Sequence, residues 1–147
     1  MIREPGVPLT FVDTNVLAYA HDVSEPSKQR IAADLLASLW DTRAGVLSTQ
    51  VLQEFYVVVT RKFSPPLPVA AARRLLASYG HWRLVVVDLP IIVRATILGE
   101  RYPLSFWDAL IVAAAEAVGA ERLVSEDFQP GLEIEGVLIE NPFARIP

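Results

Sequence analysis

Acidic side chains stand at four places in this chain of 147 residues where a strand is expected to end or a helix to begin. Asp13 and Asp127 each follow a short apolar run, and Glu54 and Asp108 lie near the start of apolar helical segments. Crowded carboxylates repel one another and burial raises their pKa, so such a group calls for a cation. Because every ligand is an oxygen, the expected ion is Mg²⁺, with Mn²⁺ as a substitute.

Polar neighbours of these acids have competing roles, and the candidates are Thr14, Asn15, Ser105 and Glu126. Thr14 and Ser105 suit helix capping as well as support of a carboxylate or of a metal-bound water. Asp108 lies three residues after Ser105, the spacing of a capping box, so capping competes with metal binding there too. Glu126 places a second acid beside Asp127, and the sequence leaves open which of the two faces the metal.

Strand-like and helix-like segments alternate along the chain and would position these residues. Apolar runs predict strands at residues 9–12, 46–47, 84–87, 122–125 and 132–139; residues 84–87 read as the clearest buried strand, and residues 132–139 as an edge strand. Apolar residues at helical spacing predict helices that begin near residues 16, 24, 49, 69, 90 and 105. This alternation predicts a three-layer α/β/α domain with a central, mainly parallel sheet of four or five strands.

A parallel sheet binds ligands at the carboxyl ends of its strands, where the strand order reverses. Asp13 and Asp127 are expected at that edge, and Glu54 and Asp108 in the first turns of helices that start from it. Each acid alone has an ordinary explanation, because an Asp after a strand often caps a helix and a Glu often faces solvent. Their expected convergence is what favours a metal site.

Length and composition limit the alternatives. A chain of residues 1–147 suits a single domain, and no apolar stretch is long enough to span a membrane, so a cytoplasmic protein is expected. There are no cysteines, which excludes disulfides and thiolate zinc sites. The net charge of −4 argues weakly against a nucleic-acid binder, although clustered carboxylates would themselves lower the total. Six cations are candidates for a basic rim: Arg61, Lys62, Arg73, Arg74, Arg94 and Arg101.

Four blocks that hold the acids resemble, in order, the motifs of the PIN-domain family, and more narrowly those of VapC-type toxins. They are residues 11–17 (FVDTNVL), 48–56 (STQVLQEFY), 105–111 (SFWDALI) and 123–128 (LVSEDF). The resemblance implies a Mg²⁺-dependent endoribonuclease that cleaves RNA, is blocked by a cognate antitoxin protein and forms a homodimer. It assigns both catalysis and metal binding to Asp13, Glu54, Asp108 and Asp127, and it favours a hydrogen bond from Asn15 to the acids.

Two other functions fit part of the pattern. A non-catalytic PIN-like module would bind RNA or protein without cleavage, although the presence of all four acids counts against it. A phosphatase on a similar sheet is the other alternative, but the haloacid-dehalogenase type needs an Asp at the position of Asn15. No glycine-rich phosphate loop is present, which argues against nucleoside triphosphate hydrolysis.

Overall fold

The structure is a computed structural model that describes residues 3–129 and 131–144. Six strands form one sheet in the order β3-β2-β1-β4-β6-β5. They are β1 (Thr10–Val12), β2 (Gly45–Ser48), β3 (Arg83–Val85), β4 (Arg122–Val124), β5 (Glu133–Ile134) and β6 (Val137–Glu140). All neighbouring strands are parallel except β5, which is antiparallel to β6. The predicted α/β fold with a mainly parallel sheet is therefore confirmed.

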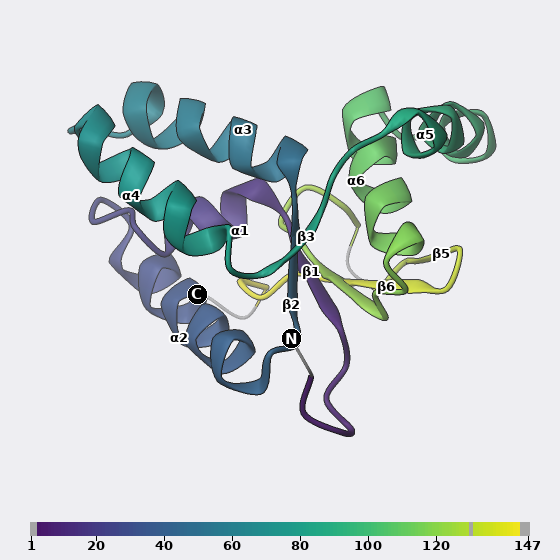
Figure 1. The fold of residues 1–147 in the computed structure, drawn as a ribbon, viewed down its shortest axis with the longest axis horizontal. Coiled ribbons are helices and arrows are strands. Elements are labelled where there is room, and N and C mark those ends of the chain that lie inside the picture. The colour runs from purple at the N-terminus through teal and green to yellow at the C-terminus, as the bar shows by residue number, and fades with distance from the viewer. Residues whose placement is uncertain (1–2, 130, 145–147) are drawn as a thin grey trace.

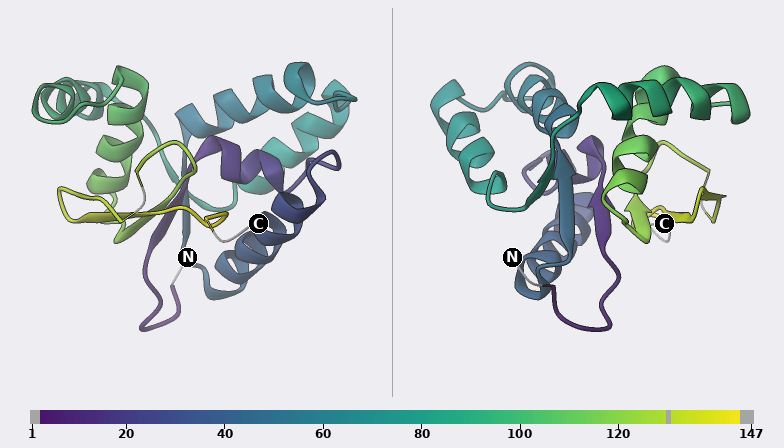
Figure 2. Two further views of the ribbon diagram at one scale, coloured as in Figure 1. Left: turned by 180° about the vertical axis from the view of Figure 1, so that it is seen from behind. Right: turned by 45° about the vertical axis from the view of Figure 1, so that its right-hand side comes forward.

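Helices cover both faces of this sheet (Figure 1). They are α1 (Thr14–Tyr19), α2 (Pro26–Thr42), α3 (Thr49–Val57), α4 (Val69–Tyr79), α5 (Leu89–Arg101) and α6 (Phe106–Ala117), and α3 continues into a π-helical turn, η1 (Val58–Lys62). Helices α1 to α4 lie on one side, and α6 lies on the other with α5 packed outside it, as the two views of Figure 2 also show. The chain thus has the predicted three layers.

A polar side chain caps each helix that matters for the site, and two of these helices, α1 and α3, directly follow the strands β1 and β2. Asp13 caps α1 by accepting a hydrogen bond from the backbone N–H of Thr14, and Ser48 caps α3 through the N–H of Val51. Ser105 caps α6 in the same way. Capping satisfies backbone donors that the first helical turn leaves free, so these residues fix where each helix starts.

The core lies between the sheet and the helices on its two faces. Phe11, Leu47 and Leu123 on three neighbouring strands are fully buried, and α6 presents the buried alanines 113–115. Helix α6 contacts β2, β4 and β6, so it crosses the centre of the sheet. Among the described residues, no helix combines the length and apolar character that crossing a bilayer requires.

Two strand predictions were wrong in detail. Residues 84–87 are not the best-buried strand, because β3 lies at the edge of the sheet, pairs only with β2 and is half-buried. Residues 132–139 form a hairpin of β5 and β6 rather than one strand, so the sheet has six strands instead of four or five. The hairpin turns at Glu135 and Gly136, both with positive φ, and a Glu is an uncommon residue in that conformation.

Candidate functional site

A cleft of about 440 Å³ opens between α3 and α6, above the carboxyl ends of β1 and β4. The strand order reverses at this point, because the sheet continues from β1 to β2 and β3 on one side and from β1 to β4 on the other. All four acids singled out from the sequence line it: Asp13, Glu54, Asp108 and Asp127. Four segments far apart in the chain therefore bring carboxylates to one cavity.

Asp13 lies at the bottom of the cleft and is almost fully buried, with 4% of its surface exposed. Its backbone N–H donates to the carbonyl of Val124, so the ladder between β1 and β4 holds its position. Each carboxylate oxygen accepts one short hydrogen bond: Oδ1 from the N–H of Thr14 at 2.7 Å, and Oδ2 from the hydroxyl of Ser125 at 2.7 Å. These bonds fix the orientation of the carboxylate.

Burial raises the pKa of Asp13 from 3.8 to about 6. The hydrogen bonds from Ser125 and Thr14 act in the opposite direction, whereas the nearby negative charges of Asp127 and Glu54 raise the pKa further. The ionised form of Asp13 is thus disfavoured by its surroundings, and a cation in the cleft would favour it.

Two neighbours of Asp13 hold the next two acids. The hydroxyl of Thr14 donates to Glu54 at 2.8 Å, which links α1 to α3. The side-chain amide of Asn15 donates to both carboxylate oxygens of Asp127, at 3.3 and 3.2 Å. Burial, followed by the negative charges of Asp108 and Glu126, raises the pKa of Asp127. Thr14 and Asn15 therefore support carboxylates of the site through hydrogen bonds, a role that the sequence had left open for both.

Asp108 lies in the first turn of α6, whereas Glu54 lies in the second turn of α3 rather than the first. The hydroxyl of Ser105 accepts a hydrogen bond from the backbone N–H of Asp108 at 3.1 Å. Ser105 acts as a helix cap and does not line the cleft. Trp107, beside Asp108, lines the cleft with 62% of its surface exposed.

Glu126 points away from this cleft. Its carboxylate accepts hydrogen bonds from Lys28 at 2.6 Å and from the hydroxyl of Tyr19 at 2.9 Å. The ammonium of Lys28 also lies over the ring of Tyr19, at 4.7 Å from its centre. Of the two adjacent acids, the structure places Asp127 in the cleft and Glu126 in an ion pair with α2.

The PIN-domain family model matches residues 10–129, a range that contains all four acids. The chain belongs to the PIN-domain family. Three solved structures share the fold. A toxin–antitoxin complex from Klebsiella pneumoniae has a TM-score of 0.66 and 21% identity, over 90% of this chain and 97% of that one. VapBC2 from Rickettsia felis, bound to a DNA fragment from its promoter, has a TM-score of 0.63 and 19% identity, over 90% of this chain and 97% of that one.

The third structure is Mycobacterium tuberculosis VapC20, a toxin that cleaves the sarcin–ricin loop. It has a TM-score of 0.55 and 20% identity, over 78% of this chain and 86% of that one. Comparison with curated protein sequences gave no match. At these identities the three structures support the PIN fold, while the activity of this chain has to be argued from its own cleft.

Two residues of this PIN domain were not recognised from the sequence as parts of the site. Ser125 is fully buried and holds both Asp13 and, through its oxygen, the N–H of Asp127 at 3.1 Å. Gln50 lines the cleft one turn before Glu54. Lys62, one of the cations predicted for a basic rim, lies in η1 and lines the cleft, and π-helical turns are frequent at functional sites. Only Ser125 had a signal, as a small polar residue that ends a buried strand.

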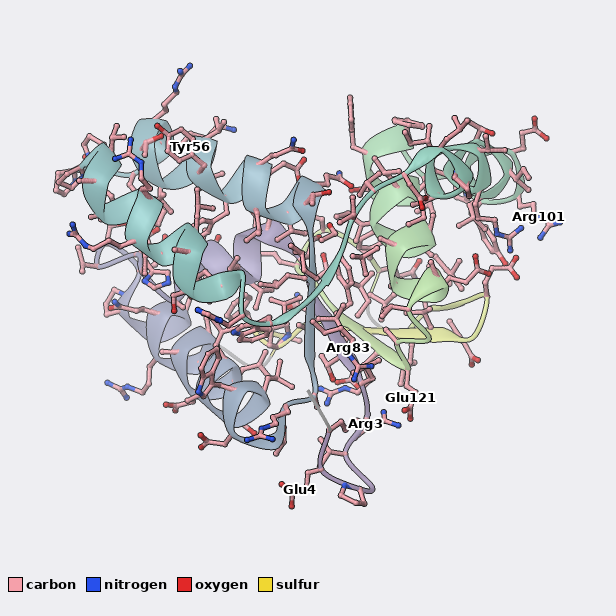
Figure 3. All side chains as sticks on the ribbon, viewed as in Figure 1. Arg3, Glu4, Tyr56, Arg83, Arg101 and Glu121 are labelled. Carbon is pink, nitrogen blue, oxygen red and sulfur yellow. The ribbon has the colours of Figure 1, made fainter. Side chains whose placement is uncertain are left out.

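Two of the other cations that were candidates for a basic rim are engaged elsewhere. Arg94 forms a two-pronged ion pair with Glu116 at 2.8 and 2.9 Å, and Arg101, at the right of Figure 3, pairs with Glu135 at 3.1 Å. The pair of Arg3 and Glu121 lies at the opposite end of the molecule from the cleft (Figure 3). Neither Arg94 nor Arg101 lines the cleft of the PIN domain, whereas Lys62 does.

The donors in the cleft fit a hard divalent cation because they are carboxylate and amide oxygens. They include Asp13, whose negative charge is buried and is not paired with a positive charge among the described residues. Within residues 3–129 and 131–144, no three acidic or histidine side chains are already close enough to hold one ion between them. Mg²⁺ usually binds through one or two carboxylates and keeps several of its waters.

Proposed function

We propose that this protein is a Mg²⁺-dependent endoribonuclease that hydrolyses RNA phosphodiester bonds as the toxin of a toxin–antitoxin pair in the cytoplasm. Mn²⁺ is expected to substitute for Mg²⁺, since both ions prefer oxygen ligands. The observation that carries the proposal is the convergence of Asp13, Glu54, Asp108 and Asp127 on one cleft, with the pKa of two of them raised. Membership of the PIN-domain family supports it.

Asp13, Asp108 and Asp127, with Glu54, would hold the metal ion. When bound, such an ion activates water and stabilises the negative charge that develops on the phosphate. The protein supplies the orientation: Ser125 and the N–H of Thr14 hold Asp13, the hydroxyl of Thr14 holds Glu54, and Asn15 holds Asp127. Lys62 at the rim provides a positive charge that attracts a phosphate of the RNA backbone towards the acids.

The test is cleavage of a mixed RNA substrate by the purified protein in Mg²⁺, in Mn²⁺ and in excess chelator. Asp13→Asn and Asp108→Asn should each abolish cleavage, whereas Glu121→Gln should not. Glu121 is a suitable control acid because it pairs with Arg3 away from the cleft. Metal-dependent cleavage that needs both aspartates would support the proposed site.

Intact RNA with a folded, metal-binding protein would favour the alternative, a non-catalytic PIN-like module that binds RNA or protein. Cleavage that continued in chelator, or in both aspartate variants, would contradict the proposed site. A direct binding experiment identifies the alternative, because a non-catalytic module retains affinity for RNA or for a partner protein while it leaves the phosphodiester bonds unbroken.

A protein antitoxin and a second copy of the chain are the proposed partners. The antitoxin is supported by two similar structures, which are toxin–antitoxin complexes. A homodimer is supported by apolar side chains that α5 leaves exposed. A short reading frame beside the gene, whose product co-purifies with this protein and inhibits RNA cleavage, would support the first partner; an adjacent product without effect on cleavage would count against it.

A further inference from the structure

Gln50 has an unusual environment in the wall of the cleft. Only 6% of its surface is exposed, and its side-chain oxygen Oε1 is the single buried side-chain oxygen or nitrogen atom without a hydrogen-bond partner among the described residues. A buried acceptor without a donor costs roughly 1–3 kcal/mol, so an unsatisfied atom of this kind points to a missing partner.

The other end of the same amide is occupied. Nε2 of Gln50 donates to the backbone carbonyl of Trp107 at 3.2 Å, which ties α3 to the first turn of α6. If the amide were turned over, its oxygen would face the carbonyl oxygen of Trp107, and neither atom can donate. This bond therefore fixes the orientation of the amide and leaves Oε1 as the free acceptor.

Gln50 lies between two of the acids. It is four residues before Glu54, so both side chains lie on one face of α3, and it bonds the residue immediately before Asp108. All three residues line the cleft. Because the acids offer acceptors only, the ligand that brings hydrogen-bond donors into this cleft most readily is a hydrated cation, whose polarised waters donate strongly.

We infer that Oε1 of Gln50 accepts a hydrogen bond from a water of hydration of the cation held in the cleft. This inference rests on the proposed function for the presence of the ion, and it deepens that function by naming a positioning residue. Gln50 thereby has two tasks: its nitrogen holds α6 and Asp108 in place, and its oxygen supports the water shell on the side of α3 and α6.

The experiment measures the binding of Mn²⁺ to the intact protein by titration calorimetry and electron paramagnetic resonance, with no RNA present. Gln50→Met keeps the length and apolar stem but removes donor and acceptor, and Gln50→Glu keeps the acceptor but removes the donor. Gln53→Met is the matched control, because Gln53 lies on the same helix and lines the same cleft but is exposed. Circular dichroism and thermal melting verify that each variant is folded.

We expect Gln50→Met to weaken Mn²⁺ binding by about 10-fold, the lower end of the range for residues that support metal ligands, and Gln53→Met to leave it unchanged. Gln50→Glu should bind at least as tightly as the unsubstituted protein. Cobalt(III) hexaammine, whose ammines donate hydrogen bonds and are not displaced by carboxylates, should compete with Mn²⁺ and lose affinity in Gln50→Met.

Two results would overturn the inference. If Gln50→Met binds Mn²⁺ normally, the oxygen has no role in binding; if Gln50→Glu binds as weakly as Gln50→Met, the residue acts only through its bond to Trp107. If Gln50→Met does not fold, Gln50→Glu is compared with the unsubstituted protein instead, and weaker binding of Mn²⁺ by Gln50→Glu would overturn the inference. A protein that binds no Mn²⁺ at all would contradict the proposed function itself, which is a different outcome from normal binding by the Gln50 variants.

Discussion

Asp13 combines a structural and a chemical task in one side chain. It caps α1 and is held by Ser125, yet its burial raises its pKa to about 6. The native state therefore retains a proton between about pH 4 and 6 that an unfolded Asp releases, and stability falls as the pH rises through this window. Since each pH unit corresponds to about 1.4 kcal/mol, the cost at neutral pH approaches 3 kcal/mol without a bound cation.

Asp13→Asn should accordingly stabilise the metal-free protein at neutral pH, by up to about 3 kcal/mol, while abolishing RNA cleavage. The amide oxygen can still accept from the N–H of Thr14, and the hydroxyl of Ser125 can rotate to accept from the new NH₂ group. Urea unfolding at several pH values measures the effect. A variant that is less stable than the parent at pH 7, or whose stability falls as steeply as the parent's between pH 4 and 6, would contradict this account of Asp13.

Asp127 and Glu126 provide a second comparison at the scale of single residues. Asp127→Asn should weaken Mn²⁺ binding by about 10-fold or more because it removes a charge that lines the cleft, whereas Glu126→Gln should change it little. Glu126→Gln should instead loosen the contact with Lys28, at a cost below about 1 kcal/mol for a partly exposed pair. Titration with Mn²⁺ and urea unfolding separate the two effects, and equal losses of affinity would contradict the assignment.

The acids could be predicted from the sequence because each follows a recognisable strand end or helix start, and parallel topology brings such positions to one edge. The same reasoning could not decide between Glu126 and Asp127, since that choice depends on the partner that Lys28 offers from a distant helix. Gln50 was missed for a related reason, because its role depends on a contact between α3 and α6.

Among the elements, helices were easier to predict than strands. The helix predicted to begin near residue 69 is α4 (Val69–Tyr79), and its limits are marked in the sequence by Pro68 and Gly80. The burial of strand β3 was predicted wrongly because a short β-branched run occurs in both central and edge strands, and only the pairing partners distinguish the two. The β5–β6 hairpin was not predicted, because Glu135–Gly136 is a weaker signal for a turn than Asn-Gly.

Strand β2 begins at a glycine whose small size is required by tertiary packing. A Cβ atom at Gly45 would collide with the ring of Trp82, so Gly45→Ala should destabilise the protein by about 1–3 kcal/mol. Gly99→Ala is the matched control: Gly99 lies inside α5 with open space where a Cβ would be, and the substitution should stabilise by about 0.5–1 kcal/mol. Urea unfolding measures both, and a neutral Gly45→Ala would show that Trp82 moves aside freely.

At the scale of the whole molecule, the solvent-exposed face of α5 is separate from the cleft. Helix α5 packs against α6 through Ile91, Ala95 and Leu98, and this leaves its other face to solvent at the periphery of the molecule (Figure 1). That outer face carries four exposed apolar residues, Leu89, Ile92, Val93 and Ile97. Their spacing of three, one and four residues places them along one stripe of the helix, and contiguous apolar surface of this kind favours association.

Val93→Asp should therefore shift the protein from dimer to monomer. In a two-fold symmetric dimer one substitution places two carboxylates in the interface, so the effect is doubled, while an exposed position in the monomer tolerates the charge. Val23→Asp is the control, because Val23 is exposed at 70% and lies outside α5. Sedimentation velocity over a range of protein concentrations gives the answer: a Val93→Asp protein that still dimerises, or a parent protein that is monomeric throughout, would show that the stripe on α5 is not the self-association surface.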